Sequence, residues 1–196
     1  MYFDKELHRG YNVYIDAARD DLGTMMDVGL LVMEPGDTYA ICDGEKETAV
    51  LLFEGAVALS YGDTTVLADR PDCFRYEAYC LLAPRGTKIT LTARSHAELY
   101  IQQTPNDRDY APVLYTPETV QVQHAGANGE IYETHHNGLA VINHGFHSQC
   151  AAPGYAMCYA WGIRHLPGNP WEKTRIDDPE HAWLWKPDAN DHIFKG

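Results

Sequence analysis

Histidines gather in the second half of the chain, and histidine is the side chain that most often binds a catalytic metal. The candidates are His124, His135, His136, His144, His147 and His165. A metal site in a β-barrel needs three or four nitrogen or oxygen ligands that converge from facing strands. Residues two apart in a strand share a face, so a His-x-His pair supplies two ligands economically. That pair does not occur in this sequence.

The remaining spacing still allows one metal site. His136 shares a strand face with Glu130 if that strand is regular, and His144 and His147 converge only through a turn at Gly145. We therefore take Glu130, His136, His144 and His147 as candidate ligands of one divalent metal, Zn²⁺ or Mn²⁺. The alternative stays open that these histidines have surface or core roles and that no metal is bound.

Two further residues are candidates for substrate binding. Arg164 offers a bidentate fork for a carboxylate, as Arg75 and Arg85 also do. Tyr155 is a candidate hydrogen-bonding partner, with a role as a core aromatic as the alternative. The first half of the chain contains His96 between residues 24 and 103 and no other histidine there. We therefore expect the first half to be an apolar scaffold without metal.

The stretch between Thr24 and Gln103 determines the expected fold. Short strands restart about every 8–12 residues, and turn signals such as Glu34-Pro-Gly-Asp, Glu54-Gly and Pro84-Arg-Gly separate them. This punctuation is typical of an all-β barrel or sandwich, and we predict a jelly-roll barrel. The expected strands are Tyr11–Ile15, Asp27–Met33, Thr38–Ile41, Thr48–Leu52, Ala56–Tyr61, Thr64–Ala68, Tyr79–Ala83, Lys88–Ala93 and Ala97–Gln103.

A second, shorter group of strands follows a linker candidate at residues 104–112, where two prolines and two acidic residues discourage regular structure. We divide the chain into a complete first barrel with a leading strand, residues 1–110, and a shortened second barrel with a Trp-rich tail, residues 111–196. One helical turn is expected near Pro179–Trp183. The later strands are expected at Thr119–His124, Glu130–His135, Leu139–Asn143, His147–Ala151 and Ala156–Gly162.

Composition and charge exclude several classes of function. The net charge is −13 and no basic cluster occurs, so we expect no nucleic-acid partner. The longest apolar run is too short to span a bilayer, and the N-terminus lacks an apolar signal region, so we expect no membrane partner and a cytoplasmic location. The five cysteines lack a Cys-x-x-Cys pair. We expect them to be free and mostly buried, as in a reducing compartment.

The sequence resembles the bicupin uronate isomerases, specifically the 5-deoxyglucuronate isomerase family of inositol breakdown. The resemblance covers most of the chain and implies a cupin fold. It is carried by Met25-Met-Asp-Val-Gly-Leu-Leu, Glu34-Pro-Gly-Asp-Thr-Tyr, Glu47-Thr-Ala-Val-Leu-Leu-Phe-Glu-Gly, Cys80-Leu-Leu-Ala-Pro, Gly145-Phe-His, Ala152-Pro-Gly-Tyr and Asp178-Pro-Glu-His-Ala-Trp.

In this family a His-x-His strand, a following Glu and a later His hold a divalent metal in the C-terminal cupin. His147 falls on the later His, whereas the segment for the other ligands is missing from this chain. The resemblance implies an aldose–ketose isomerase for a sugar acid, with His147 as a catalytic residue. The alternative is a degenerate, non-catalytic cupin that binds a sugar acid or another small metabolite without metal. Because a shortened barrel leaves open edges, we also expect a homodimer.

Overall fold

The structure is a computed structural model, and it describes residues 2–3, 5–19, 23–120, 139–141, 157–164, 168 and 179–185. Within these ranges every element is a β-strand except one short 3-10 helix, so the all-β prediction is confirmed. No helix in this part of the chain is long and apolar enough to cross a membrane.

The strands begin and end close to the predicted positions, with one main exception described below. They are β1 (Tyr2–Phe3), β2 (Gly10–Ile15), β3 (Asp27–Met33), β4 (Thr38–Ile41), β5 (Lys46–Tyr61), β6 (Thr64–Arg70), β7 (Tyr79–Ala83), β8 (Ile89–Ala93), β9 (Ala97–Pro105), β10 (Val113–Tyr115) and β11 (Leu139–Ala140), and the helix is η1 (Pro179–Trp185).

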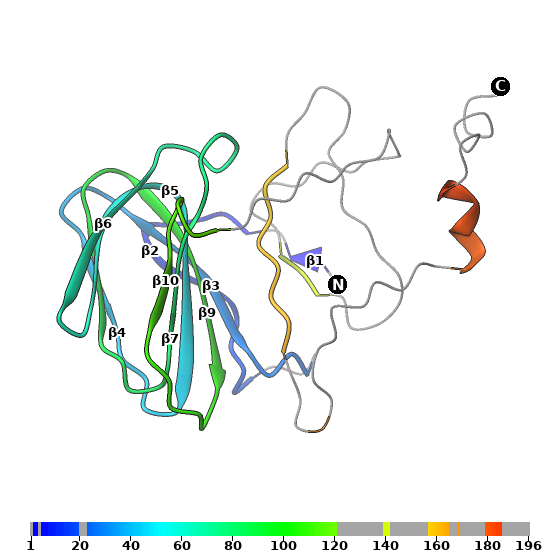
Figure 1. Ribbon diagram of the computed structural model, residues 1–196, viewed down its shortest axis with the longest axis horizontal. Coiled ribbons are helices and arrows are strands. Elements are labelled where there is room, and N and C mark those ends of the chain that lie inside the picture. Colours follow the sequence, from blue (N-terminus) through cyan, green and yellow to red (C-terminus); the bar gives the residue numbers. More distant parts are fainter. Residues whose placement is uncertain are drawn as a thin grey trace.

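The long strand β5 belongs to two sheets and joins them into a jelly roll (Figure 1). Its first part pairs with β7 and β9, within the strand order β10-β7-β5-β9-β3-β2. Its second part pairs with β6 and β8, and β8 also pairs with β4. All these pairs are antiparallel. We call the sheet that contains β3 and β9 the front sheet.

The space between the sheets is filled by apolar side chains, as the sequence predicted. Alternate residues of each strand point inward, because successive side chains in a strand face opposite sides. Ten of the largest of these residues have at most 2 % of their surface exposed, so this layer is the hydrophobic core of the barrel. They are Leu31, Met33, Val50, Leu52, Val57, Leu81, Ile89, Leu91, Leu99 and Ile101.

Strand β5 replaces two predicted strands, Thr48–Leu52 and Ala56–Tyr61. The expected turn at Glu54-Gly55 is instead a β-bulge, since the register with β9 shifts between Leu52 and Glu54. The burial pattern shows the extra residue. Leu52 and Val57 both belong to the core although they are five positions apart, an odd separation that regular alternation forbids.

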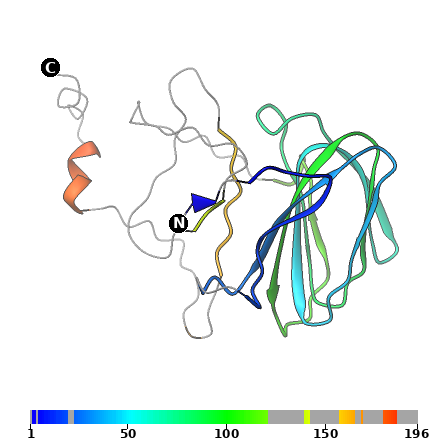
Figure 2. The same cartoon turned by 180° about the vertical axis from the view of Figure 1, so that it is seen from behind.

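The outer side of the front sheet is also covered. Val28, Leu30 and Val32 of β3 alternate with the core residues and are nevertheless buried. The segment of residues 157–164 runs beside β3 and β9 in both views (Figures 1 and 2). A Cβ added to Gly162 would lie 2.2 Å from Oε1 of Gln102 on β9, so the contact is close.

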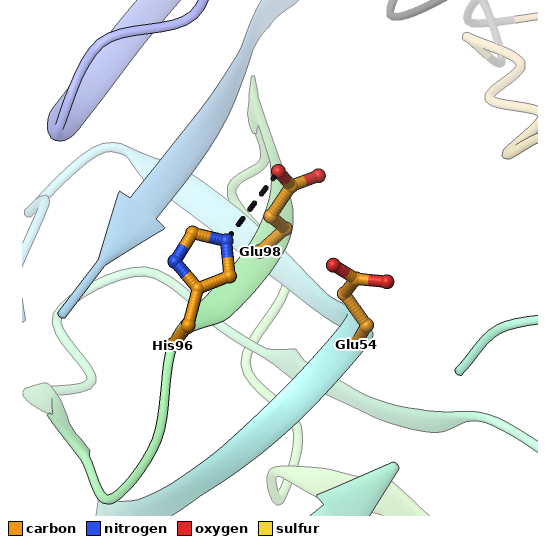
Figure 3. Close-up of side chains that lie close together, drawn as sticks. All are labelled: Glu54, His96 and Glu98. Carbon is orange, nitrogen blue, oxygen red and sulfur yellow. Dashed lines mark ion pairs between the residues drawn. The ribbon is translucent and has the colours of Figure 1, made fainter. Parts of the chain in front are cut away.

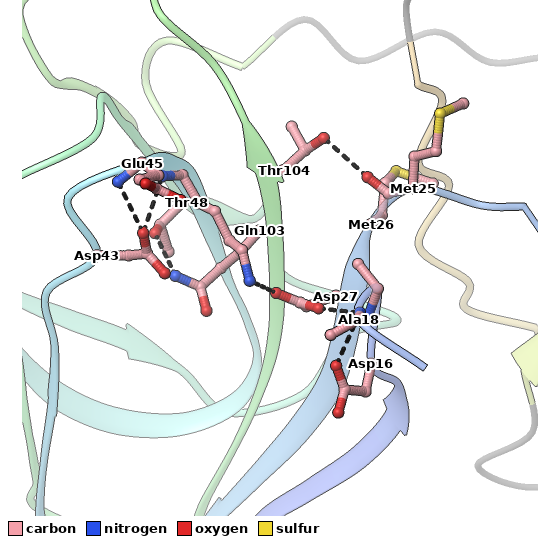
Figure 4. Close-up of polar contacts among 12 residues, drawn as sticks. Asp16, Ala18, Met25, Met26, Asp27, Asp43, Glu45, Thr48, Gln103 and Thr104 are labelled. Carbon is pink, nitrogen blue, oxygen red and sulfur yellow. Dashed lines mark hydrogen bonds and ion pairs between the residues drawn. The ribbon is translucent and has the colours of Figure 1, made fainter. Parts of the chain in front are cut away.

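The end of the barrel where β3 begins is closed by polar contacts (Figure 4). Asp27 accepts a hydrogen bond from the Ala17 N–H and pairs with Lys46. The Thr104 hydroxyl donates to the Met25 carbonyl at 3.2 Å. These contacts join the start of β3 to β5 and to the end of β9, so this end of the front sheet is fixed by side chains as well as by backbone pairing.

In the second half of the chain, the structure confirms some of the elements predicted from sequence and contradicts others. Helix η1 confirms the helical turn predicted near Pro179, and β11 lies within a predicted strand and pairs with β1. The predicted strand Ala156–Gly162 is wrong for its described residues, 157–162, which have no regular structure. Strand β10 was not predicted. It pairs antiparallel with β7 and so adds an edge strand to the front sheet.

The cysteines are free, as expected, in the described part of the chain. They are less buried than predicted, since Cys42 and Cys158 are exposed and Cys73 and Cys80 are half-buried. Burial and the neighbouring Cys158 thiol raise the pKa of Cys73, so the segment of residues 157–164 lies beside the loop that precedes β7.

Candidate metal centre

Three side chains that can bind a metal meet on the outer side of the front sheet, near the first residue of β9. They are Glu54, His96 and Glu98, and one ligand atom from each lies within 4.8 Å of the others. Figure 3 shows Glu54 on β5 facing Glu98 on β9 and His96, the residue directly before β9. The His96 Nε2 lies 3.8 Å from a Glu98 carboxylate oxygen, longer than a hydrogen bond. We call these residues the β5–β9 cluster.

His96 and Glu98, at the start of β9, are brought together by strand geometry. His96 and Glu98 are separated by one residue, Ala97, which points into the core and is fully buried. Positions two apart in a strand share a face, so His96 and Glu98 both lie on the outer side. His96 comes directly before the strand, where its side chain is 47 % exposed.

Glu54 joins the cluster because of the bulge in β5. In a regular strand Glu54 would share the inward face of Leu52, and a carboxylate there would enter an apolar core at a large cost in free energy. The extra residue, Phe53, points outward and lies against Tyr100, with 6.2 Å between the ring centroids. The alternation then restarts and pairs Glu54 with Glu98 across the two strands.

The turn before His96 is fixed on the same bulge. Arg94 N–H donates to the Ala56 carbonyl at 2.8 Å, and Ala56 N–H donates to the Ser95 hydroxyl at 2.9 Å. Gly55 lies between the two elements with φ of +96°. A Cβ on Gly55 would lie 2.1 Å from the His96 carbonyl oxygen, so only glycine permits this approach.

A fourth residue, Glu34, orients the imidazole. The His96 Nδ1 lies 2.9 Å from a Glu34 carboxylate oxygen, and because an ionised carboxylate only accepts, Nδ1 is the donor. Glu34 begins a turn that is attached to the end of β8, since Gly36 N–H and the Ala93 carbonyl form a hydrogen bond of 2.9 Å. Asp37 accepts from the Glu34 N–H and pairs with Arg9, which fixes the turn further.

The electrostatics of the cluster reflect three carboxylates around one imidazole. The hydrogen bond to Glu34 raises the pKa of His96 above its ordinary value, and the charges of Glu34, Glu98 and Glu54 act in the same direction. Burial raises the pKa of Glu98, and the neighbouring Glu54 charge raises it further. Glu54 and Glu98 are like charges directly opposite each other across two strands, an arrangement that is unfavourable without a cation between them.

Most of the site predicted from sequence falls outside the described residues. This applies to the predicted metal ligands Glu130, His136, His144 and His147, and also to Tyr155. Arg164 is described and half-buried in the segment of residues 157–164. Within the described part of the chain its buried Nε has no hydrogen-bond partner.

The β5–β9 cluster was missed because the sequence was searched for several histidines. His96 alone was taken as evidence against a metal in the first barrel. The available signal was His96-Ala97-Glu98, which supplies two ligands to one strand face as a His-x-His pair does. Glu54 could not have been added, because the sequence predicts a turn at Glu54-Gly55, and the register that pairs Glu54 with Glu98 is set by the bulge.

Comparison with known proteins places this fold. The model of the KduI/IolB family matches residues 2–130 and 128–184. An IolB-like protein from Salmonella typhimurium LT2 is similar in structure, with a TM-score of 0.58 and 20% sequence identity over 65% of this chain. The chain spans 49% of that protein. No curated protein matches the chain.

Two further solved structures are similar to part of this chain. The Cnp3 cupin domain of Schizosaccharomyces pombe has a TM-score of 0.38 and 11% identity, over 49% of this chain and 60% of that domain. Salicylate 1,2-dioxygenase from Pseudoaminobacter salicylatoxidans has a TM-score of 0.38 and 17% identity, over 47% of this chain and 24% of the enzyme. The all-β cupin fold predicted from sequence is confirmed. Because the family model extends over nearly the whole length, this chain belongs to the KduI/IolB family.

Proposed function

We propose that this protein is a sugar isomerase of carbohydrate catabolism that interconverts the aldose and ketose forms of a sugar acid resembling 5-deoxyglucuronate. The observation that carries the proposal is the match of the KduI/IolB family model to residues 2–130 and 128–184. The structural likeness to an IolB-like protein supports a place in inositol breakdown. Since the chain spans about half of that protein, the activity is carried over as part of the proposal.

The reaction requires a hydrogen to move between adjacent carbons. A base removes the proton from C2 of the aldose while the oxygen on C1 gains a proton, which gives an ene-diol. A proton is then delivered to C1 and the hydroxyl on C2 loses its proton, so atoms and charge balance. We assign His147 the catalytic role, and His147, His144, His136 and Glu130 the role of metal ligands. A divalent metal, when bound, polarises the substrate carbonyl.

The acid group of the substrate needs a local cation, because the net charge of −13 repels anions at long range. Arg164 suits this role. Its buried Nε–H has no acceptor among the described residues, and buried polar groups in folded proteins are nearly always paired. A sugar-acid carboxylate would satisfy that donor, with Tyr155 as the proposed second contact.

The test is to follow a 5-deoxyglucuronate-type aldose by proton NMR in deuterated water. Isomerisation replaces the C1 aldehyde signal by ketose signals. We expect turnover by the wild type and by His8→Gln, an exposed histidine in the described N-terminal segment, and none by His147→Ala. Arg164→Gln should raise KM more than it lowers kcat if Arg164 binds the acid group.

Binding without turnover would refute the isomerase and support the second function, a non-catalytic cupin that binds a sugar acid. A thermal-shift titration with the same compound, read together with the NMR assay, distinguishes the two functions, because both predict binding and only one predicts the ketose.

The free thiols of Cys42, Cys73, Cys80 and Cys158 support a reducing location, and we propose the cytoplasm.

A further inference from the structure

We propose that the β5–β9 cluster binds a divalent transition-metal ion, with His96 Nε2 and the carboxylates of Glu54 and Glu98 as its three protein ligands. This site lies on the outer side of the first barrel and shares no residue with the ligands proposed for the isomerase. It departs from our expectation that the first barrel carries no metal. The apolar filling of the barrel is unaffected, because the cluster faces away from it.

The distances suit such an ion. Ligands about 2.1 Å from a tetrahedral Zn²⁺ lie about 3.4 Å from one another. The ligand atoms of the cluster lie within 4.8 Å of each other, and the His96 Nε2 is 3.8 Å from Glu98. Small rotations of two glutamate side chains therefore close the coordination sphere without moving the strands.

The hydrogen bond between His96 and Glu34 also supports a metal site. Metal-binding histidines usually donate their other ring N–H to a carboxylate or a carbonyl, which fixes the ring and the tautomer. Glu34 accepts from the His96 Nδ1 at 2.9 Å and is not one of the three ligands. The lone pair of the neutral ring is then on Nε2, the nitrogen that faces Glu98.

The bulge in the backbone of β5 supports a metal site as well. The bulge turns Glu54 out of the core and pairs it with Glu98, which is half-buried, with 24% of its side chain exposed. Two carboxylates in direct register repel one another, and bulges commonly aim a side chain at a site. A bound dication removes the repulsion.

The ligand set indicates the class of ion. Imidazole favours Zn²⁺ over Mg²⁺ and Ca²⁺, and two carboxylates also suit Mn²⁺. Three protein ligands leave at least one position for water or for an oxygen of a small molecule. His96 is partly exposed, so the ion can enter from solvent.

The test locates the ion by NMR on the full chain after removal of metal with a chelator. Paramagnetic Mn²⁺ should selectively broaden the amide signals of Gly55 and Ala97, and Zn²⁺ should reverse the broadening by competition. His96→Gln should abolish the effect. Glu34→Gln should weaken Mn²⁺ binding by about 10–100-fold, the loss typical of a residue that orients a ligand.

Matched variants separate this site from others. Glu45→Gln, an exposed carboxylate at the opposite end of the barrel, should bind Mn²⁺ as the wild type does (Figure 4). His147→Ala should also keep the broadening at Gly55 and Ala97, whether or not the isomerase proposal holds. If His96→Gln fails to fold, Glu98→Gln is the second variant that removes a ligand.

Two results would overturn the proposal. One is that excess Mn²⁺ leaves the Gly55 and Ala97 signals unchanged in the folded wild type. The other is that their broadening survives both His96→Gln and Glu98→Gln. Loss of isomerase activity in His147→Ala with intact broadening would support both proposals, since the two readouts are independent.

Discussion

Replacing Gly55 by alanine tests how closely β5 approaches the turn that carries His96. Gly55 has φ of +96°, and an added Cβ would lie 2.1 Å from the His96 carbonyl oxygen and 2.6 Å from the Ala97 Cα. Both are backbone atoms, so no side-chain rotation relieves the contact. Gly36 is the matched control, because its φ is +90° and nothing lies within 4 Å of its added Cβ.

The free energy of unfolding should separate the two variants. A non-glycine residue at positive φ costs about 1–2 kcal/mol, and the stiffer unfolded chain returns about 0.4–1 kcal/mol. Gly36→Ala should therefore lose about 1 kcal/mol. Gly55→Ala has the same two contributions and must also displace backbone, for which overpacking costs about 1–3 kcal/mol. At about 2–4 °C per kcal/mol for a chain of this size, this additional cost of about 1–3 kcal/mol should make Gly55→Ala melt about 2–12 °C below Gly36→Ala.

The assay is thermal and urea unfolding followed by circular dichroism, with both variants measured beside the wild type. The conformational terms are common to both substitutions, so their difference isolates the close approach. Equal losses in the two variants, or a smaller loss in Gly55→Ala, would show that β5 does not lie against the His96 turn as described.

Other expectations follow from burial, charge and topology. Leu99→Ala should cost about 2–5 kcal/mol in urea unfolding because Leu99 is fully buried; Leu67→Ala, at a side chain 59% exposed, should stay within about 0.5 kcal/mol, and similar losses would contradict the assigned core. The hydrogen bond from Arg9 lowers the pKa of Asp37 to about 2, against about 3.9 in unfolded chains. The stability from this pair is therefore present above about pH 4 and lost as the pH falls through about 2. The urea midpoints of wild type and Arg9→Gln should converge on acidification, and a difference independent of pH would refute this pairing. The homodimer predicted from the open sheet edges should give twice the chain mass in light scattering, and a monomeric mass would count against it.

The sequence determined the strands and the core of the first barrel. Alternation in segments such as Ala56–Tyr61 assigns Val57 and Leu59 to one face, and both are buried in the structure. Turn residues such as Pro35 and Gly36 mark where strands end, because their backbone conformations do not continue a strand. These signals are local, and each can be read within a few residues of the chain. The cupin fold followed from them together with the family resemblance.

Only the tertiary structure decided where the β5–β9 cluster forms. Strand alternation predicts that His96 and Glu98 share a face. It does not predict where Glu54 points, because the sequence indicates a turn at Glu54-Gly55 and the observed bulge depends on the register between β5 and β9. Glu34 is 62 residues from His96 in the chain and reaches it only because its turn is hydrogen-bonded to the end of β8. Registers and contacts between distant turns are set by the packing of the whole barrel. A local pattern encodes which face a side chain occupies, and it does not encode what lies opposite.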